Sequence, residues 1–276
     1  MCHDKRPARA GHAIGRGRPA AGLVPSGLHR RRARARGHRV RRPPVTGAAA
    51  LGAGEFTAAL HAHSDRYWHK HPFHLRLHEG TLGRGELQRW AANRWYYQKW
   101  LPQKDAAVVA NCPVPAVRRR WVQRISFQDG TAEGRGGLAG WLALAEATGL
   151  DRAEVLDERH VLPGVRFATD AYVHFARTRP WTEAVAASLT ELFSPGLMRQ
   201  RLTALRTHYP WITPSGHGYH ATRPQTAASD AQHALAVVVA SCTTRSEQDA
   251  ALAALAFKCD VLWSMLDAVD HAGRTG

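Results

Sequence analysis

Apolar residues recur every three or four positions over most of the chain, as they do along the buried face of an amphipathic helix. The clearest stripes fall at 87–95, 138–145 and 252–266. No segment between residues 55 and 271 alternates in the way a half-buried strand does, and no internal repeat is present. The pattern therefore predicts an all-α fold.

Prolines and glycines set the expected ends of these helices. Gly149 suits the position after a helix end, and Asp151 with Glu154 resembles a capping box that starts the next helix. Pro163 can open a helix that runs through Tyr172. Further helices are expected over 181–193, 227–242 and 246–271, whereas the Gly/Pro-rich segment 208–224 reads as a loop.

The first fifty residues differ sharply from the rest in charge. They hold thirteen Lys and Arg against one acid, Asp4, which is +12 of the chain's +16 and leaves +4 for the remaining 226 residues. A segment so rich in Arg, Gly, Ala and Pro cannot bury enough apolar surface to fold. We therefore predict a disordered basic extension over 1–54 and a folded domain over 55–272. The extension could be a nucleic-acid-binding arm or a segment without a role, and we assign it none.

The four cysteines form no Cys-x-x-Cys pair and no zinc-like spacing. The chain also starts without an apolar signal segment and has no run of eighteen apolar residues. We therefore expect reduced thiols in a cytoplasmic protein, with neither a membrane nor a nucleic acid as its partner.

Candidate chemistry concentrates in the segment 94–130. Arg94 and Gln98 are four apart, as are Arg124 and Gln128, so each pair shares a helix face. Pro102 is expected to divide this segment into separate helices. Its aromatic residues interleave with these groups and with a Lys-Asp pair: Trp95, Tyr96, Tyr97, Trp100, Trp121, Lys104 and Asp105. Cations held near aromatic walls suit a flat ligand with several carboxylates. The alternative is that these residues form the solvated basic face of an amphipathic helix.

Two charged residues stand in apolar surroundings. Lys258 lies on the last apolar stripe, where it needs an anion, from the protein or from a ligand, unless it snorkels at the stripe's edge. Glu191 ends an expected helix, where the helix dipole disfavours a carboxylate. It therefore needs a cationic partner, and Arg199 and Arg201 are near in sequence.

Two pairs of possible metal ligands lie four residues apart. They are His74 with His78 and Asp170 with His174. No Glu-x-x-His segment accompanies them, so polar or substrate-facing histidines are the favoured interpretation.

Several segments resemble the pyrroloquinoline-quinone synthase family. They are RWYYQ (94–98) with LPQKDAAVVANCP (101–113), RRRWVQRI (118–125), ERHVLPGVRFATDAY (158–172), SLTELFSP (188–195), HYPWI (208–212) and FKCDVLWSMLDA (257–268). The match keeps a consistent order from about Glu55 to Ala272.

The resemblance implies a compact bundle of about seven helices, similar to the haem-oxygenase fold but without haem, and a homodimer. Enzymes of this family are oxidases that need neither a metal nor a redox cofactor. They close a ring on a bicyclic precursor derived from amino acids and oxidise it with O2, releasing hydrogen peroxide. The product, pyrroloquinoline quinone (PQQ), is a planar tricarboxylate, so a small tricarboxylate-type molecule is the implied partner.

The resemblance also implies site residues. Those that match substrate-contacting positions are Tyr67, Arg94, Gln98, Lys104, Asp105, Arg124, Tyr172, Thr190, Glu191 and Arg201. Tyr219, Arg223 and Lys258 match positions near the point where oxygen meets the ring, and with Glu191 and Gln128 they form the expected catalytic set. A mobile segment over 208–224 would close over the ligand and exclude water.

Three positions depart from the family's pattern, which has histidine where this chain has Gln128, Met198 and Trp68. His69 could replace the third with a one-residue shift. Glutamine does not titrate near neutral pH, and methionine packs without proton chemistry. Three hypotheses stay open: an oxidase, a non-enzymatic carrier or sensor of PQQ or its precursor, and a metal-dependent oxygenase that uses the two pairs of possible ligands.

Overall fold

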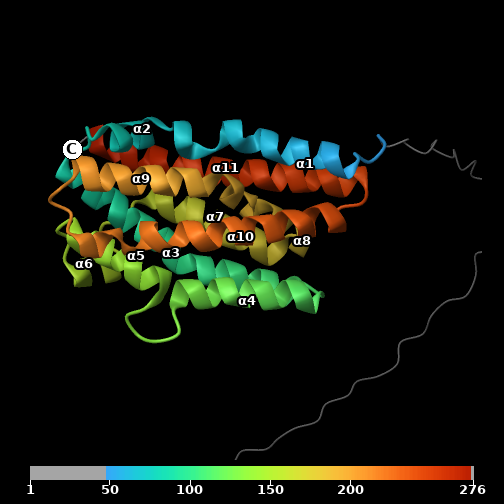
Figure 1. The fold of residues 1–276 in the computed structure, drawn as a ribbon, viewed down its shortest axis with the longest axis horizontal. Coiled ribbons are helices and arrows are strands. Elements are labelled where there is room, and N and C mark those ends of the chain that lie inside the picture. The colour runs from blue at the N-terminus through green and yellow to red at the C-terminus, as the bar shows by residue number, and fades with distance from the viewer. Residues whose placement is uncertain (1–47, 275–276) are drawn as a thin grey trace, which may run out of the picture. The chain divides into compact units, whose positions relative to one another are not determined.

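The computed structural model describes residues 48–274, which form helices and connecting turns without a strand (Figure 1). The α-helices are α1 (Ala53–Ala62), α2 (Pro72–Glu79), α3 (Arg84–Asn111), α4 (Pro115–Asp129), α5 (Gly136–Ala147), α6 (Arg152–Leu156), α7 (Pro163–Thr178), α8 (Trp181–Ala187), α9 (Ser194–His208), α10 (Gly218–Ser241) and α11 (Arg245–Arg274). Short 3-10 helices are η1 (His63–Arg66), η2 (Trp68–Lys70), η3 (Ser188–Phe193) and η4 (Pro214–His217). The all-α prediction is confirmed.

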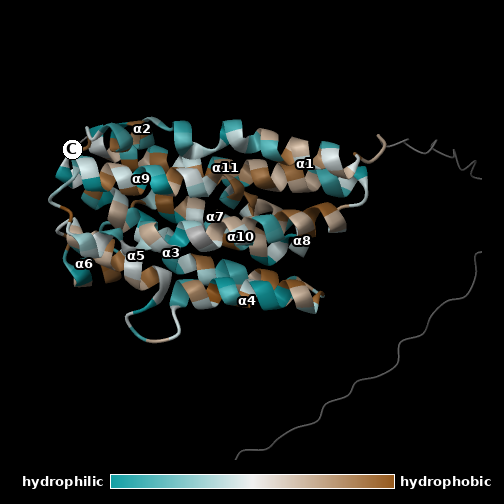
Figure 2. Cartoon of the chain, in the orientation of Figure 1, coloured by the Kyte–Doolittle hydropathy of each residue, from teal (hydrophilic) through white to brown (hydrophobic). Residues whose placement is uncertain are grey.

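Seven of the helices in this part of the chain have twelve residues or more, and they build the bundle: α3, α4, α5, α7, α9, α10 and α11. Helix α3 packs against α4, α5 and α7, while α11 packs against α7 and α8, and α10 against α9 and α5. The axes of most of these helices are roughly aligned with one another (Figure 1). Coloured by hydropathy, they carry apolar and polar stripes side by side (Figure 2).

The predicted apolar stripes form the core. Leu87 and Ala91 of α3 are fully buried, as is Trp141 of α5. The Trp141 indole Nε1 donates a hydrogen bond to the Ala91 carbonyl oxygen at 2.9 Å, so α5 is fixed on α3 by polar as well as apolar contacts.

Three predicted helix ends are also confirmed. Gly149, just after α5, has φ of +94°, a conformation that glycine adopts without strain. The Asp151 carboxylate accepts hydrogen bonds from the backbone of Ala153 and Glu154 at 2.8 and 3.2 Å, which caps α6. Pro163 is the first residue of α7.

The predicted break at Pro102 was wrong, because α3 continues through it to Asn111. A proline inside a helix leaves the carbonyl four residues earlier without its usual donor. Here that carbonyl belongs to Gln98, and it accepts a hydrogen bond from the Gln128 side-chain amide at 3.2 Å. A contact from α4 therefore replaces the lost backbone bond.

The predicted loop over 208–224 is also shorter than expected. Helix α10 already begins at Gly218 and passes through Pro224. Before it, Tyr209 is buried and its hydroxyl donates to the Leu77 carbonyl oxygen at 3.1 Å. The sequence signal failed because a proline at the seventh position of α10 does not end that helix.

The predicted start of the folded domain at residue 55 falls inside α1, which begins at Ala53. Just before it, the Leu51 backbone exchanges two hydrogen bonds with the Gln248 side-chain amide, at 2.8 and 3.0 Å. The last residues assigned to the extension are therefore part of the folded unit. Residues 1–47 lie outside the described residues, and the prediction of a disordered extension stays a prediction there.

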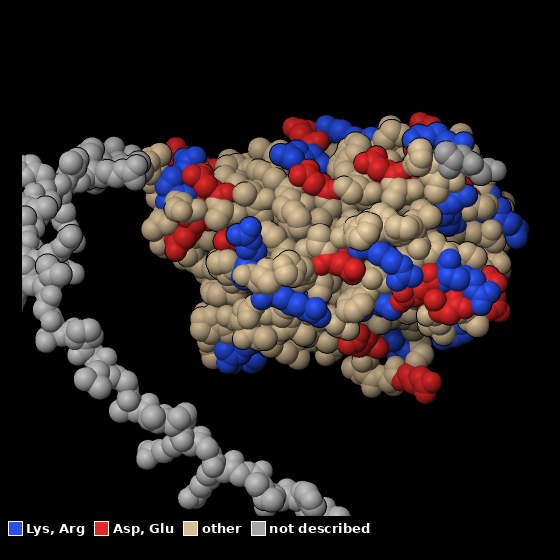
Figure 3. Space-filling model, turned by 180° about the vertical axis from the view of Figure 1, so that it is seen from behind, with Lys and Arg blue, Asp and Glu red and all other residues tan. Residues whose placement is uncertain are grey.

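On the face drawn in Figure 3, lysine and arginine side chains alternate with aspartate and glutamate, without a large area of one sign. This agrees with the small net charge that the sequence gives for the part after residue 50. Over residues 48–274, none of the helices is both long and apolar enough to span a membrane.

Candidate active site

A cavity lies inside the bundle, between α3, α4, α7, η3, α9, α10, α11 and the Tyr67-Trp68 segment. Its lining residues are Tyr67, Trp68, Arg94, Tyr97, Leu101, Lys104, Asp105, Arg124, Phe127, Gln128, Tyr172, Ser188, Thr190, Glu191, Ser194, Leu197, Met198, Arg201, Tyr219, Arg223, Lys258 and Leu262. All the predicted site residues are among them except Gln98, which lies behind Gln128 and Tyr219 and bonds to both. Centres of water-sized molecules can occupy about 70 Å³, so a tricyclic ligand requires lining side chains to move.

One side of the cavity is a network of ion pairs. Arg124 of α4 makes two hydrogen bonds of 2.7 Å to Glu191, and Arg223 of α10 donates to Glu191 at 3.1 Å and to Asp230 at 2.9 Å. Lys104 pairs with Asp105, whose carboxylate lies 3.5 Å from Arg124. Three cations and three carboxylates therefore offset one another here, and Arg120 reaches Asp230 from the rim at 3.7 Å.

This network corrects the expectation for Glu191. Its partners are Arg124 and Arg223, whereas Arg199 is exposed and Arg201 lies elsewhere in the cavity. Burial raises the pKa of the Glu191 carboxyl, but the positive charges of Arg124 and Arg223 outweigh it and lower the pKa to about 2. Glu191 is therefore ionised at neutral pH.

Three further cations of the cavity have no such partner: within residues 48–274, Arg94, Arg201 and Lys258 make no ion pair with a carboxylate. The guanidinium of Arg94 lies over the Trp68 and Tyr97 rings, at 4.8 and 4.1 Å from their centroids. Its Nε and one terminal nitrogen are buried without a hydrogen-bond partner. A buried donor of this kind is costly unless a ligand satisfies it.

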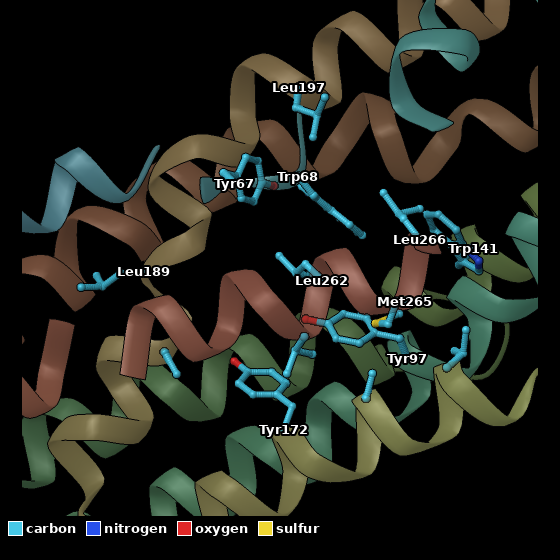
Figure 4. Close-up of a cluster of buried hydrophobic side chains, with 14 of the residues drawn as sticks. Tyr67, Trp68, Tyr97, Trp141, Tyr172, Leu189, Leu197, Leu262, Met265 and Leu266 are labelled. Atoms are coloured by element: carbon cyan, nitrogen blue, oxygen red, sulfur yellow. The ribbon is translucent and has the colours of Figure 1, made fainter. Parts of the chain in front are cut away.

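Lys258 is 2% exposed and does not snorkel. Its ammonium nitrogen donates to the Tyr97 hydroxyl at 2.5 Å and lies 3.6 Å from the centroid of the Tyr172 ring. Burial lowers the pKa of Lys258 well below its ordinary value, and the charges of Arg94 and Lys104 add to this. The Tyr97 and Tyr172 rings are stacked on each other, with their centroids 6.3 Å apart, and both face α11 (Figure 4).

Arg201 is held by histidines instead of carboxylates. One of its terminal nitrogens lies 2.9 Å from His74 Nε2 and the other 3.4 Å from His220 Nε2. His74 Nδ1 lies 2.9 Å from the Trp68 carbonyl oxygen, an arrangement that leaves Nε2 as the acceptor. Burial, followed by the charge of Arg201, lowers the pKa of both histidines well below the ordinary value. They orient Arg201 without neutralising it.

Gln128 belongs to a chain of hydrogen bonds. Its side-chain nitrogen donates to Gln98 Oε1 at 2.9 Å, and Gln98 Nε2 donates to the Tyr219 hydroxyl at 3.0 Å. Residue 128 is therefore connected to Tyr219 through one intermediate side chain. Tyr219 in turn packs edge-on against Trp141, with ring centroids 5.2 Å apart.

The three positions where the resemblance led us to expect histidine all line the cavity, as Trp68, Gln128 and Met198. His69 stacks on Tyr67 at 5.9 Å between ring centroids and is not among the lining residues. The expectation that His69 could replace the histidine missing at 68 was wrong, because the η2 turn directs Trp68 inward.

None of the four possible metal ligands is among the residues that line the cavity. The rings of His74 and His78 are stacked, and His74 is engaged by Trp68 and Arg201, while Asp170 accepts a hydrogen bond from the Tyr96 hydroxyl at 3.0 Å. In the described part of the chain, no group of three or more His, Cys, Asp or Glu side chains is placed to hold a metal ion.

Asp230 and His220 are not among the residues that the sequence predicts for the site. A signal for Asp230 was present, because it is the single acidic residue of α10 and lies seven positions after Arg223, on the same helix face. His220 gave no such signal, since histidines beside a glycine-rich turn are common.

Comparisons with known proteins identify the family and agree with this fold. The profile of the TENA/THI-4/PQQC family matches residues 57–268. A pyrroloquinoline-quinone synthase of Pseudomonas aeruginosa strain LESB58 is 50% identical over 225 residues, covering 81% of this chain and 90% of the relative. One of Klebsiella pneumoniae is 49% identical over 222 residues, covering 80% of this chain and 88% of the relative.

Solved structures support the fold. A domain of unknown function with a haem-oxygenase-like fold from Shewanella denitrificans has a TM-score of 0.68 at 15% identity, covering 82% of this chain and 95% of that one. A TenA homologue from Pseudomonas syringae has a TM-score of 0.64 at 10% identity, covering 82% of this chain and 99% of that one. With a family match over most of its length and relatives at about half identity, the chain belongs to the TENA/THI-4/PQQC family.

Proposed function

We propose that this protein is a pyrroloquinoline-quinone synthase, an oxidase that closes the ring of the bicyclic PQQ precursor and oxidises it with O2. Relatives that carry this name are about half identical to it over four-fifths of the chain. The cavity suits the product, because it combines buried cations with aromatic walls.

The observation that carries the proposal is the match of charges. Arg94, Arg201 and Lys258 are cations without a carboxylate partner among the described residues, and PQQ has three carboxylates. Lys104 and Arg124, in contrast, already face Asp105 and Glu191. An anion that pairs with the first set gains charge-assisted hydrogen bonds worth roughly 1.5–3 kcal/mol each.

A flat ligand can enter this small cavity when the cations that now cover the aromatic rings move away from them. Arg94 now lies on Trp68 and Tyr97, and Lys258 lies on Tyr172. Cation–π contacts are weaker than an ion pair with a carboxylate in the same place. Ligand carboxylates therefore draw these cations off the rings, which frees the ring faces to stack on the ligand.

Proton chemistry in the cavity falls to groups other than histidine. Burial lowers the pKa of Lys258 well below its ordinary value, so this side chain can exchange a proton with bound precursor more readily than an exposed lysine. Tyr219 supplies a hydroxyl oriented by Gln98, and Arg223 supplies positive charge where oxygen is reduced. Glu191 orients Arg124 and Arg223, while Tyr67 and Thr190 complete the lining that the substrate contacts.

We further propose that the reaction needs O2 as its co-substrate and neither a metal nor a redox cofactor, and that the protein acts as a cytoplasmic homodimer. The buried free thiols of Cys112, Cys242 and Cys259 support a reducing compartment. The resemblance to the synthase family supports the dimer.

Turnover tests this function. Protein treated with a chelator and mixed with precursor under oxygen is expected to consume O2, release hydrogen peroxide and develop the quinone chromophore. Tight PQQ binding without oxygen consumption would instead favour the carrier or sensor. Oxygen consumption that is lost on chelation and restored by metal would favour the metal-dependent oxygenase.

Binding of PQQ is expected to take up a proton at Lys258. Burial lowers the pKa of the free lysine well below 10.5, and a bound carboxylate raises it again. Affinity therefore falls as the pH rises through the window between the free and bound pKa values. Calorimetry over a series of pH values, in buffers of different ionisation enthalpy, measures this as a net uptake of protons per ligand within that window.

Two variants make this measurement specific. Lys258→Met should lose the proton uptake and bind PQQ about ten- to a hundredfold more weakly. Lys99→Met, which changes a partly exposed lysine outside the cavity, should keep the proton uptake and the PQQ affinity of the unaltered protein. Binding without proton uptake in the unaltered protein would show that Lys258 does not change its protonation state when PQQ binds.

A further inference from the structure

A second, smaller cavity lies beside the one described. It is lined by Trp68, Trp90, Asn93, Arg94, Val165, Met265, Leu266 and Val269. Trp68 and Arg94 line both cavities, so together they form a shared wall. None of the other residues has a role in the proposed chemistry.

The walls of this cavity are almost entirely apolar. Val165, Met265, Leu266 and Val269 are each at most 3% exposed. The amide of Asn93 is fully engaged, since it donates to the carbonyl oxygens of residues 89 and 160 and accepts from the backbone of residue 162, all within 3.1 Å. Buried water needs two to four polar partners, and almost none of the surface that faces this cavity is polar, so the cavity does not favour water.

The cavity is also small. The centre of a water-sized molecule can occupy about 10 Å³ of it, which is room for about one small molecule. An organic substrate is excluded by size and water is disfavoured by polarity. A small apolar gas remains as the class of ligand that fits both, because dry apolar cavities bind such gases.

We propose that this cavity is a dioxygen site that supplies the reaction cavity across the wall formed by Trp68 and Arg94. The proposal rests on the proposed function, in which O2 is the co-substrate. The wall is held by ring contact, with the Arg94 guanidinium 4.8 Å from the Trp68 centroid, while Trp68 Nε1 and Arg94 Nε have no hydrogen-bond partner. No hydrogen bond of these two atoms therefore has to break when the wall opens. In Figure 4 the Trp68 side chain extends towards Leu266 of α11.

The chain carries its own probes for this site. It has three methionines, Met1, Met198 and Met265. Met265 lines the apolar cavity and Met198 lines the reaction cavity. With the methionine methyl groups labelled with ¹³C, relaxation under dissolved O2 and under argon reports how often the paramagnetic gas approaches each methyl, without any turnover.

Three valine variants complete the design. Val269→Ile, or Val165→Ile from the opposite helix, adds a methylene at the apolar cavity. Val261→Ile makes the same change at a buried position of α11 that lines neither cavity. We expect the first two to reduce the O2-induced relaxation of the Met265 methyl several-fold and leave Met198 unchanged. The third should change neither.

Kinetics then connects the site to the reaction. Val269→Ile should raise the KM for O2 several-fold, with unchanged kcat at saturating oxygen and unchanged PQQ affinity. Relaxation of Met265 that both cavity-filling variants leave intact would overturn the dioxygen site, and an unchanged KM for O2 would overturn its supply role. If the relaxation result holds but no turnover occurs, the proposed function fails and the gas site stands.

Discussion

Replacement of Arg124 by methionine is expected to lower the free energy of unfolding by about 3–5 kcal/mol. Arg124 is 7% exposed and makes two hydrogen bonds to Glu191, with Asp105 and Asp230 at 3.5 and 3.6 Å. Its removal leaves these carboxylates with less positive charge around them inside the bundle. Chemical denaturation of the full chain measures the loss.

A matched control separates burial from the substitution itself. Arg119 lies on the same helix, is exposed, and takes part in none of these ion pairs. Arg119→Met should therefore change the unfolding free energy by about 0.5 kcal/mol at most. Adding Glu191→Gln to Arg124→Met should restore part of the lost stability, because it removes one of the stranded charges.

The pH dependence of this loss has a definite sign. The pKa of Glu191 is lowered from 4.5 to about 2 in the folded protein, so its stabilisation is complete above 4.5 and disappears as the pH falls towards 2. The difference between Arg124→Met and the unaltered protein should therefore shrink over that window. A difference that stays constant, or that Arg119→Met reproduces, would contradict the role of the network.

The helical fold could be predicted from sequence because 3.6-residue periodicity is a local property that burial reinforces. The break at Pro102 could not, because the contact that compensates for the proline comes from Gln128, thirty residues away. The neighbouring residues in the sequence indicate only that a proline within a helix costs free energy. Tertiary contacts decide whether that cost ends the helix.

The candidate site likewise contains features that the sequence could predict and features that it could not. Lys258 was recognisable in the sequence because a charged side chain is unexpected on the apolar face of a helix. The structure buries it against the rings of Tyr97 and Tyr172. Glu191 also stood out, but nearness in sequence pointed to the wrong arginines. Its partners Arg124 and Arg223 come from α4 and α10, and only the packing of those helices brings them together.

Replacement of Gln128 by histidine is expected to accelerate ring closure and oxidation by about a hundred- to ten-thousand-fold, the usual contribution of a positioned acid–base group. The imidazole can donate to Gln98 as the amide of Gln128 does, which keeps the connection to Tyr219. The neighbouring Gly137 has no side chain, and a Cβ there would lie 2.5 Å from Gln128 Oε1, so α5 leaves the space that this position needs.

The pH profile distinguishes proton transfer from a merely structural gain. With histidine at 128, single-turnover formation of the quinone should acquire a limb at roughly 6.5, if the imidazole is unperturbed. Gln128→Met, which neither titrates nor donates, should lose the hydrogen bonds to Gln98 and show no acceleration. PQQ affinity should change little in Gln128→His, because glutamine and histidine can both hydrogen-bond the ligand.

The comparison of the two rates decides what position 128 does in this protein. If the unaltered protein is already fast and Gln128→His is no faster, Lys258 and Tyr219 carry the proton transfers, and the glutamine serves to anchor α4 on the carbonyl that Pro102 leaves free. If both forms bind PQQ tightly but neither consumes oxygen, the cavity's cations serve binding alone, and the carrier or sensor replaces the oxidase. Acceleration with a new limb near the histidine pKa would place the slow step of this oxidase at the hydrogen-bond chain from residue 128 to Tyr219.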